Sequence, residues 1–455
     1  MNLSEVFAQR IIGINAAALR AAEIDQISRL LLDFSGVACG CTARPWVVRL
    51  RRWANRYDGA GRSGIIGGRA RVPAPIAALV NGTTAHSYEL DDTHDASLSH
   101  PGAVVIPAAL AVASETGASG AEFMTAMLAG YEAMAIIGMA VNTEAAMLDG
   151  FHPTAMIGGF GSAAAAARLY GLDVSGLLQA WGHVLSMTGG SMQFSDETTG
   201  TTIKRMHAGY PAKNGVLAAE LSAAGIDAPK RPLDGKYGFL ALYGRHEAKP
   251  ELLAEEKRRF AIHDISLKPY ACCREFHSMI DGLREATENF TVALSTIQAI
   301  TVRGPKCLQE QHMLRRPDSP MAAQYSLPFV AGATLEFGPT RFDAFESANL
   351  DDKGILRWAD MVEFEYDESL QANFPAHFGT EVEIRLAGGQ LRTARVLDSI
   401  GTAARPLSWE QILEKANRLT GGLDPALDIA RLERAIRDLP TRRSIDDLDV
   451  VLMMK

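Results

Sequence analysis

The sequence has 455 residues, which is long enough for about two or three domains and a large hydrophobic core. With 47% hydrophobic and 22% charged residues, its composition is that of an ordinary globular protein. The net charge of -8 argues against nucleic acid as a partner, which calls for a basic surface, so an anionic substrate would need a local basic pocket.

The first part of the chain predicts one helix after another. Residues 23–39 place apolar side chains at helical spacing, and residues 72–90 and 103–115 read as further buried helices. Ser119 and Glu122 have the spacing of a capping box, which predicts the start of a long helix ending near residue 141.

A polar stretch, residues 89–102, lies between two of these helices. No apolar face can be drawn through it, so we expect a polar loop on a rigid helical scaffold, a usual setting for catalytic side chains. Its carboxylates and imidazoles supply acids and bases with pKa values suited to proton transfer. The stretch reads Glu89-Leu90-Asp91-Asp92-Thr93-His94-Asp95-Ala96-Ser97-Leu98-Ser99-His100-Pro101-Gly102.

Two other interpretations of this stretch stay open. Asp and His can bind metal, but the stretch lacks the His-x-x-x-His spacing of zinc proteases and the Asp-x-Asp-x-Asp-Gly spacing of calcium loops, so we expect no metal. It could also be a solvated acidic loop in which His100 only caps a helix.

Two later segments add basic groups. His152 precedes Pro153 and a helix rich in small residues, where a histidine is more often a cap or a packed polar residue than a catalyst. Lys204, Arg205 and His207 follow a stretch rich in Gly, Ser and Thr, and precede a buried helix predicted at residues 212–224. They form either a carboxylate site, which we favour, or a solvated basic turn.

The pattern changes near residue 263. Residues 268–277 are mixed and polar, with vicinal cysteines that are either small buried residues or, less commonly, a catalytic thiolate. Residues 296–303 and 361–366 alternate as strands do, and a hairpin is predicted with its turn at 387–390. A helix is expected at 326–337.

Helical patterns return after residue 405, at 412–419 behind a capping box at Ser408, and at 424–437. We therefore predict a mainly α fold. A large all-helical domain, residues 1–265, is completed by residues 405–455 folding back on it, and residues 266–404 form a smaller α+β domain.

The five cysteines are odd in number and show no disulfide spacing, so reduced thiols in a cytoplasm are the simplest explanation. Residues 1–20 lack an export signal, and we find no apolar run long enough to span a bilayer. We expect a cytoplasmic protein with no membrane contact. The cysteines are Cys39, Cys41, Cys272, Cys273 and Cys307.

Taken together, these motifs resemble the MmgE/PrpD family, which includes 2-methylcitrate dehydratase, cis-aconitate decarboxylase and iminodisuccinate epimerase. The resemblance implies that the α+β domain is a lid over a cleft, that the protein is a homodimer, that the substrate is a small polycarboxylate, and that no cofactor is needed. The residues that carry it are Asn81-Gly82, His86, residues 89–102, residues 150–154, residues 204–207, Ala212-Lys213-Asn214-Gly215 and residues 268–277.

The family's chemistry begins with removal of a proton from the carbon next to a carboxylate. By this resemblance, we expect either His100 or Lys268 to be the base and the other to be the proton donor, while Lys204 and Arg205 hold a carboxylate. The catalytic candidates are His100, Lys268, His152, Lys204 and Asp91. The substrate-binding candidates are Glu89, Asp92, Thr93, Arg205, His207, Tyr270 and His277.

Two departures from the family pattern bear on the reaction. Phe329 stands where the decarboxylase has a tyrosine, and Gly102-Ala103 follows His100-Pro101 where methylcitrate dehydratases tend to have Ser-Asp. Our first interpretation is therefore an epimerase resembling iminodisuccinate epimerase, with a hydro-lyase of a citrate-like acid as the alternative. A cis-aconitate-type decarboxylase is less favoured, and the non-enzymatic alternative is a helical dimer that binds a dicarboxylate.

Overall fold

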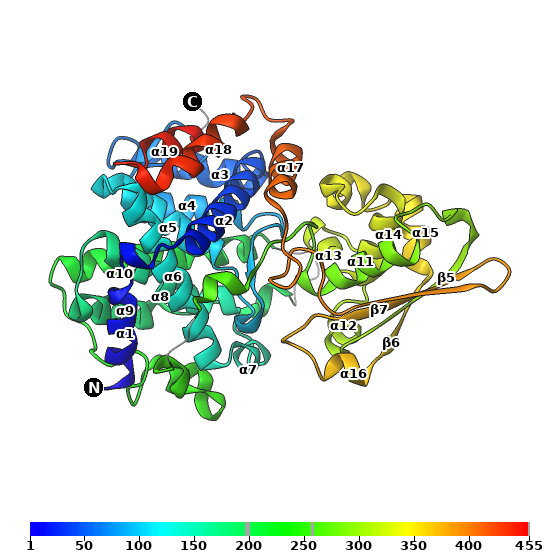
Figure 1. The fold of residues 1–455 in the computed structure, drawn as a ribbon, viewed down its shortest axis with the longest axis horizontal. Helices are drawn as coiled ribbons and strands as arrows, with labels where there is room; N and C mark the ends of the chain where they lie inside the picture. Colours follow the sequence, from blue (N-terminus) through cyan, green and yellow to red (C-terminus); the bar gives the residue numbers. More distant parts are fainter. Residues whose placement is uncertain (196–200, 256–258, 454–455) are drawn as a thin grey trace.

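The computed structural model describes residues 1–195, 201–255 and 259–453, and it has two hydrophobic cores. Figure 1 shows the larger, helical part beside a smaller part that contains the main sheet. This mainly helical architecture confirms the predicted class. The domain boundaries, and the function of the smaller part as a lid, stay predictions.

The larger core is made of long helices that pack through small residues. Gly209 lies where α10 crosses α4, and a Cβ atom there would come within 2.4 Å of the Leu79 carbonyl oxygen. Glycine is thus required for the close approach that brings the start of α10 beside the end of α4. The helices of this part are α1 (Leu3–Gly13), α2 (Ala21–Gly40), α3 (Pro45–Ala54), α4 (Ala74–Ala85), α5 (Gly102–Thr116), α6 (Gly120–Val141), α7 (Thr143–Leu148), α8 (Pro153–Leu169), α9 (Val174–Met187) and α10 (Ile203–Ala223).

The prediction that no apolar run could span a bilayer was wrong for α6. Its 22 residues have a mean hydropathy of 1.5, which is long and apolar enough for a span. However, 94% of its most apolar window is buried inside the protein, where it packs against α5 and α8. Its apolar character therefore fits its place in the core.

Three predicted helix boundaries were also wrong. The helix expected at 72–90 ends at Ala85, and Glu89 beyond it has a φ of 55°, which no helix accommodates. The helix expected at 212–224 begins at Ile203, because Pro211 lies inside it and does not start it. The helix expected at 424–437 begins at Ile429, after Asp428 caps its first turn.

The smaller core surrounds a four-stranded sheet of order β6-β5-β7-β8, in which β5 and β6 are parallel and the other pairs antiparallel. The predicted hairpin is confirmed as β7 and β8, which α11 covers. The strands are β5 (Ile297–Gly304), β6 (Val362–Tyr366), β7 (Thr380–Leu386) and β8 (Leu391–Val396). The helices are α11 (His277–Ala286), α12 (Lys306–Gln311), α13 (Pro320–Gln324), α14 (Leu327–Phe337), α15 (Lys353–Asp360) and α16 (Glu368–Gln371).

The C-terminal helices return to the larger core, where α17 and α18 pack against α2 and α19 contacts α5 (Figure 1). The predicted capping boxes at Ser119 and Ser408 are confirmed, since each hydroxyl accepts a hydrogen bond from the backbone three residues on. The bounds are α17 (Trp409–Thr420), α18 (Ile429–Asp438) and α19 (Asp446–Leu452). Two short strands, β1 (Ser63–Gly64) and β2 (Arg71–Val72), form a separate pair.

Candidate active site

The polar stretch lies between the two cores. Within it, β3 (Thr93–His94) pairs with β4 (Ile265–Ser266), which places Lys268 beside the stretch. Most of its residues are buried, and Pro101, not His100, occupies the cap position of α5. The interpretation as a solvated loop with His100 as a cap was therefore wrong.

Glu89 is the centre of a buried ionic cluster. Its Oε1 atom accepts hydrogen bonds from Lys204 Nζ and, at 2.6 Å, from Arg205 Nη1. Its Oε2 atom lies 3.4 Å from Lys268 Nζ and 3.2 Å from the hydroxyl of Tyr325. One carboxylate therefore faces three basic side chains, which come from α10 and from the segment after β4.

Electrostatics keep this carboxylate ionised. Burial alone would raise the pKa of Glu89, but Lys204, Lys268 and Arg205 hold the pKa well below its ordinary value. Burial also lowers the pKa of Lys204, with the Glu89 charge acting in the opposite direction. The interpretation of Lys204 and Arg205 as a solvated basic turn was wrong, since both side chains are buried.

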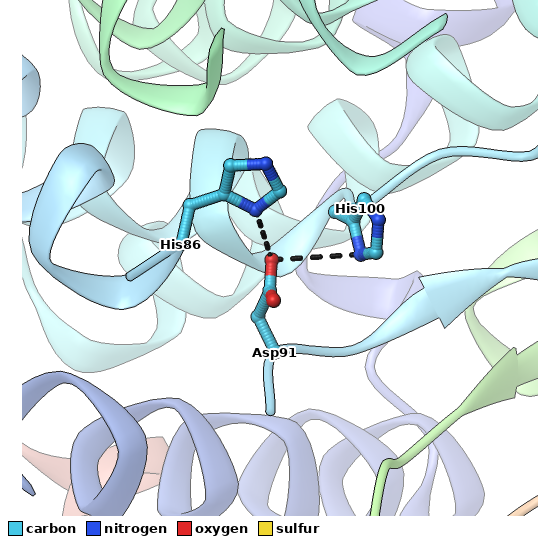
Figure 2. A group of neighbouring side chains, drawn as sticks. All are labelled: His86, Asp91 and His100. Atoms are coloured by element: carbon cyan, nitrogen blue, oxygen red, sulfur yellow. Dashed lines mark hydrogen bonds and ion pairs between the residues drawn. The ribbon is translucent and has the colours of Figure 1, made fainter. Parts of the chain in front are cut away.

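Figure 2 shows Asp91 facing two imidazoles. Its Oδ2 atom lies 2.6 Å from His86 Nδ1 and 3.5 Å from His100 Nδ1. Burial raises the pKa of Asp91, but the two imidazoles lower it by more, so the pKa lies below its ordinary value. An ionised Asp91 accepts a hydrogen bond from the protonated Nδ1 of His86. The other ring nitrogen of His86, Nε2, has no hydrogen-bond partner among the described residues.

The backbone decides the tautomer of His100. Its Nδ1 atom lies 2.9 Å from the carbonyl oxygen of Asp92, which can only accept, so Nδ1 carries the proton. Burial lowers the pKa of His100 to about 3, despite the opposing charge of Asp91. The imidazole is therefore neutral near pH 7, and the lone pair on Nε2 can act as a base.

Asp92 holds the start of α5. Its carboxylate accepts hydrogen bonds of 2.7 Å from the Tyr131 hydroxyl and of 2.7 Å from the Gly102 amide. Burial raises the pKa of Asp92 to about 7, although these two hydrogen bonds oppose the shift. Asp92 thus anchors the segment that ends in His100, through contacts with Tyr131 and Gly102 and not with the basic side chains around Glu89.

A second pair of imidazoles connects this region to a cavity. The rings of His152 and His207 are 4.9 Å apart, and the His86 ring lies 6.1 Å from that of His152. His152 is the N-cap residue of α8, but its side chain makes no capping hydrogen bond. His207 also lines a cavity of about 430 Å³ together with Phe194 and Tyr210, which is room enough for a small acid.

Comparison with known proteins identifies the family. The MmgE/PrpD N-terminal domain matches residues 5–251, and the MmgE/PrpD C-terminal domain matches residues 270–439. The chain belongs to the MmgE/PrpD family. The resemblance predicted from the sequence motifs is therefore confirmed at the level of the family.

Curated relatives cover nearly the whole chain. The cis-aconitate decarboxylase-like protein oryM of Aspergillus oryzae is 24% identical over 450 residues, which are 93% of this chain and 92% of the relative. Human cis-aconitate decarboxylase is 27% identical over 429 residues, 91% of this chain and 87% of the relative. The Aspergillus terreus decarboxylase is 24% identical over 454 residues, 93% and 90% of the two chains.

These relatives are decarboxylases, which are lyases. They support an MmgE/PrpD enzyme with chemistry of the lyase type. The epimerase interpretation is not confirmed by them.

Three of the predicted substrate-binding residues make their contacts elsewhere. The Thr93 hydroxyl donates to Asp95 at 2.7 Å, and the Tyr270 hydroxyl donates to Asp281 at 2.5 Å. His277 is fully buried and packs edge-on against the Tyr270 ring. The prediction that these three MmgE/PrpD residues bind substrate rests on the family resemblance and stays a prediction.

Sequence reasoning did not assign three residues that the fold brings to this region. His86 pairs with Asp91. The Tyr325 hydroxyl reaches Glu89, and the Gln324 side chain reaches Arg205. His86 is five residues before Asp91 at a helix end, which could have indicated the pair, but no local signal relates Tyr325 to Glu89. Phe329, noted as a departure from the decarboxylase pattern, is fully buried in the smaller core near Phe345.

One donor atom from each of His86, Asp91 and His100 lies within 4.8 Å of the others, which is close enough for the three to be candidate metal ligands. Two ligands on one tetrahedral zinc ion are about 3.3 to 3.6 Å apart. The 2.6 Å between His86 Nδ1 and Asp91 Oδ2 is instead that of a short hydrogen bond to an ionised carboxylate. We therefore interpret His86 and Asp91 as a hydrogen-bonded pair beside His100.

Proposed function

We propose that this protein is a cofactor-independent lyase that acts on a small di- or tricarboxylic acid through a carbanion next to a carboxylate. The observation that carries the proposal is the convergence of Lys204, Arg205 and Lys268 on one buried position, close to neutral imidazoles. The named relatives, which are decarboxylases, support chemistry of this class.

The charge balance suits an anionic substrate. Three cations around the single charge of Glu89 leave a formal charge of 3 − 1 = +2 at the cluster. A carbanion next to a carboxylate delocalises its charge onto the carboxylate oxygens, where buried ammonium and guanidinium groups stabilise it more strongly than water does. The three basic side chains therefore stabilise the transition state and also bind the acid.

Proton transfer is assigned to His100 and Lys268. Nε2 of neutral His100 takes or returns the proton at carbon, and Lys268 serves as the complementary group, since its ammonium already lies beside the Glu89 carboxylate. Asp91 and His86 orient this region, and Lys204 and Arg205 hold a substrate carboxylate. The homodimer and the cytoplasmic location stay predictions.

Decarboxylation, loss of water and epimerisation can all pass through such a carbanion. Loss of carbon dioxide forms it in decarboxylation, and the carbanion then takes up a proton. Removal of a proton forms it in the other two reactions, after which hydroxide leaves in dehydration or a proton returns to the opposite face in epimerisation. The relatives favour a lyase, and the fully buried Phe329, without a hydroxyl group, favours epimerisation as the second candidate. The hydroxyl of Tyr325, 3.2 Å from Glu89, supplies a different donor for a lyase.

Proton NMR in D2O with cis-aconitate, citrate, 2-methylcitrate and iminodisuccinate tests the proposal. A new vinyl signal would support a lyase. Release of carbon dioxide would then indicate decarboxylation, whereas retention of all carboxylates would indicate dehydration. Deuterium uptake with inverted stereochemistry and no alkene would make the protein an epimerase. The His100→Gln variant, purified in the same way, is the control for contaminating enzymes. Binding of the acids with no exchange and no product would contradict the proposal.

A further inference from the structure

A second group of potential metal ligands lies behind the Glu89 cluster, at the edge of the smaller core. Donor atoms of Cys273, Glu275 and His312 lie within 4.8 Å of one another. The Sγ atom of Cys307 is 3.5 Å from Glu275 Oε2. Two short segments supply all four: the turn at 273–275, and α12 with the residue that follows it. The exposed fractions of the His312 and Glu275 side chains are only 8% and 19%.

The spacing between His312 and Glu275 fits two ligands of a bound cation better than a hydrogen bond. His312 Nε2 and Glu275 Oε2 are 3.5 Å apart, and the same oxygen accepts an S–H···O hydrogen bond from Cys307 Sγ at 3.5 Å. An N–H···O hydrogen bond is about 2.7 to 3.2 Å long, whereas two ligands on a tetrahedral zinc ion are about 3.3 to 3.6 Å apart.

The orientation of His312 is fixed by the backbone. Its Nδ1 atom donates to the carbonyl oxygen of Tyr325 at 3.0 Å, and its own carbonyl oxygen accepts from the Leu327 amide at 2.8 Å. A neutral imidazole held in this way directs the lone pair of Nε2 toward Glu275. Metal-binding histidines commonly have this arrangement, with the second ring nitrogen donating to a carbonyl group.

We propose that Cys273, Glu275 and His312 bind one zinc ion. One sulfur atom, one imidazole nitrogen and one carboxylate oxygen form a donor set that suits zinc and not calcium or magnesium, which prefer oxygen ligands. With three protein ligands, the fourth position of a tetrahedral zinc ion would hold water.

The ion would hold the segment that faces the Glu89 cluster. The Cys273 amide donates to the Gln324 carbonyl oxygen at 2.9 Å, and His312 holds the carbonyl of Tyr325. The side chain of Gln324 accepts a hydrogen bond from Arg205 at 3.1 Å, and the hydroxyl of Tyr325 donates to Glu89 at 3.2 Å. Zinc would thus stabilise the contact between the two cores from the rear of the candidate active site.

The test is the zinc content of the full-length protein after expression with added zinc and removal of loosely bound metal, with the absorption spectrum of the cobalt-substituted protein as a second measurement. We expect about one zinc ion per chain in the wild type and in Cys272→Ser, the matched control at the neighbouring buried cysteine. Cys273→Ser and His312→Gln should retain less than about a tenth of that amount. Cobalt should give a thiolate charge-transfer band and the visible bands of tetrahedral coordination.

Three results would overturn the proposal. The first is a wild-type protein that holds no zinc after loading and shows no thiolate band with cobalt. The second is zinc that persists in Cys273→Ser but is lost in His100→Gln, which would place the ion at the His86, Asp91 and His100 group. The third is a disulfide between Cys273 and Cys307, detected by mass spectrometry of the unreduced protein. If the variants fail to fold, the cobalt spectrum of the wild type decides the question.

Discussion

Glu89 Oε1 accepts a hydrogen bond from Arg205 Nη1 at 2.6 Å, and both side chains are buried. The two residues are far apart in the sequence and meet because α10 crosses α4 closely before the polar stretch begins. Glu89 also adopts a φ of 55°, an uncommon backbone conformation for a residue other than glycine. Such local strain is retained where surrounding contacts fix it, as the three basic partners do here.

Glu89→Gln should lower the thermal stability markedly, because it leaves Lys204, Arg205 and Lys268 buried without their anion. Loss of one partner from a buried ionic group costs about 3 to 5 kcal/mol. A tricarboxylate such as citrate should restore much of the melting temperature. Glu23→Gln is the matched control, since buried Glu23 pairs with Arg20 and His263 away from this site. Equal rescue of both variants would contradict a substrate site at Glu89.

Lys204→Ala should raise KM and lower kcat together, because Lys204 both holds a carboxylate and stabilises the carbanion. The expected loss of transition-state binding is about 2 to 4 kcal/mol, a decrease in kcat/KM of about 30- to 1000-fold. The fold should persist, since Arg205 and Lys268 still neutralise Glu89. The measurement is steady-state kinetics of Lys204→Ala, with Lys236→Ala as the control because Lys236 is exposed. Unchanged kinetics would remove Lys204 from the substrate site.

His100→Gln should abolish deuterium exchange with little change in melting temperature. The glutamine amide can still donate to the Asp92 carbonyl oxygen, but it has no basic nitrogen to replace Nε2. NMR exchange and thermal melts of this variant and of His246→Gln, an exposed histidine, test the prediction. Unfolding of the variant would show that His100 has a structural role, and retained exchange would transfer the role of base to Lys268.

Asp92→Asn should change how stability depends on pH. Because the pKa of Asp92 is about 7 in the folded state and ordinary when unfolded, only the folded protein keeps this proton between about pH 4 and 7. The free energy of unfolding of the wild type therefore decreases by up to about 1.4 kcal/mol per pH unit as pH rises through that range. The neutral asparagine removes this loss.

The melting temperature of Asp92→Asn, relative to the wild type, should accordingly increase steadily from pH 5 to about pH 7 and then level off. Asp227→Asn, at an exposed position, should show a constant difference. A constant difference for Asp92→Asn as well would mean that Asp92 is ionised in the folded protein.

Tyr325→Phe should lower kcat by about 10- to 100-fold if the Tyr325 hydroxyl donates a proton or a hydrogen bond to the reacting acid. Burial, together with the Glu89 charge, raises the pKa of Tyr325 well above its ordinary value, so the hydroxyl stays protonated. Tyr170→Phe removes a similar hydroxyl from Glu115 and Glu220 outside the site, and should leave kcat unchanged. Equal kcat values in the wild type and Tyr325→Phe would make Tyr325 only a support for Glu89.

Local sequence signals were reliable where the determining contacts are local. The capping boxes at Ser119 and Ser408 and the hairpin turn at 387–390 depend on residues within a few positions, and all three are present. Helix ends that depend on distant contacts were missed. The helix after residue 72 stops at Ala85 because the following residues turn toward α10 and the segment after β4, which no nearby residue signals.

The sequence by itself determined many of the long helices and the strands of the main sheet, which stretches carry the chemistry-bearing side chains, and that their combined pattern resembles MmgE/PrpD. Only the tertiary structure decided that Glu89 is ionised among three cations, that His100 is neutral, and that Tyr325 faces this group. Periodicity and capping act over a few residues. A protonation state, in contrast, depends on burial and on charges that folding brings together from distant parts of the chain.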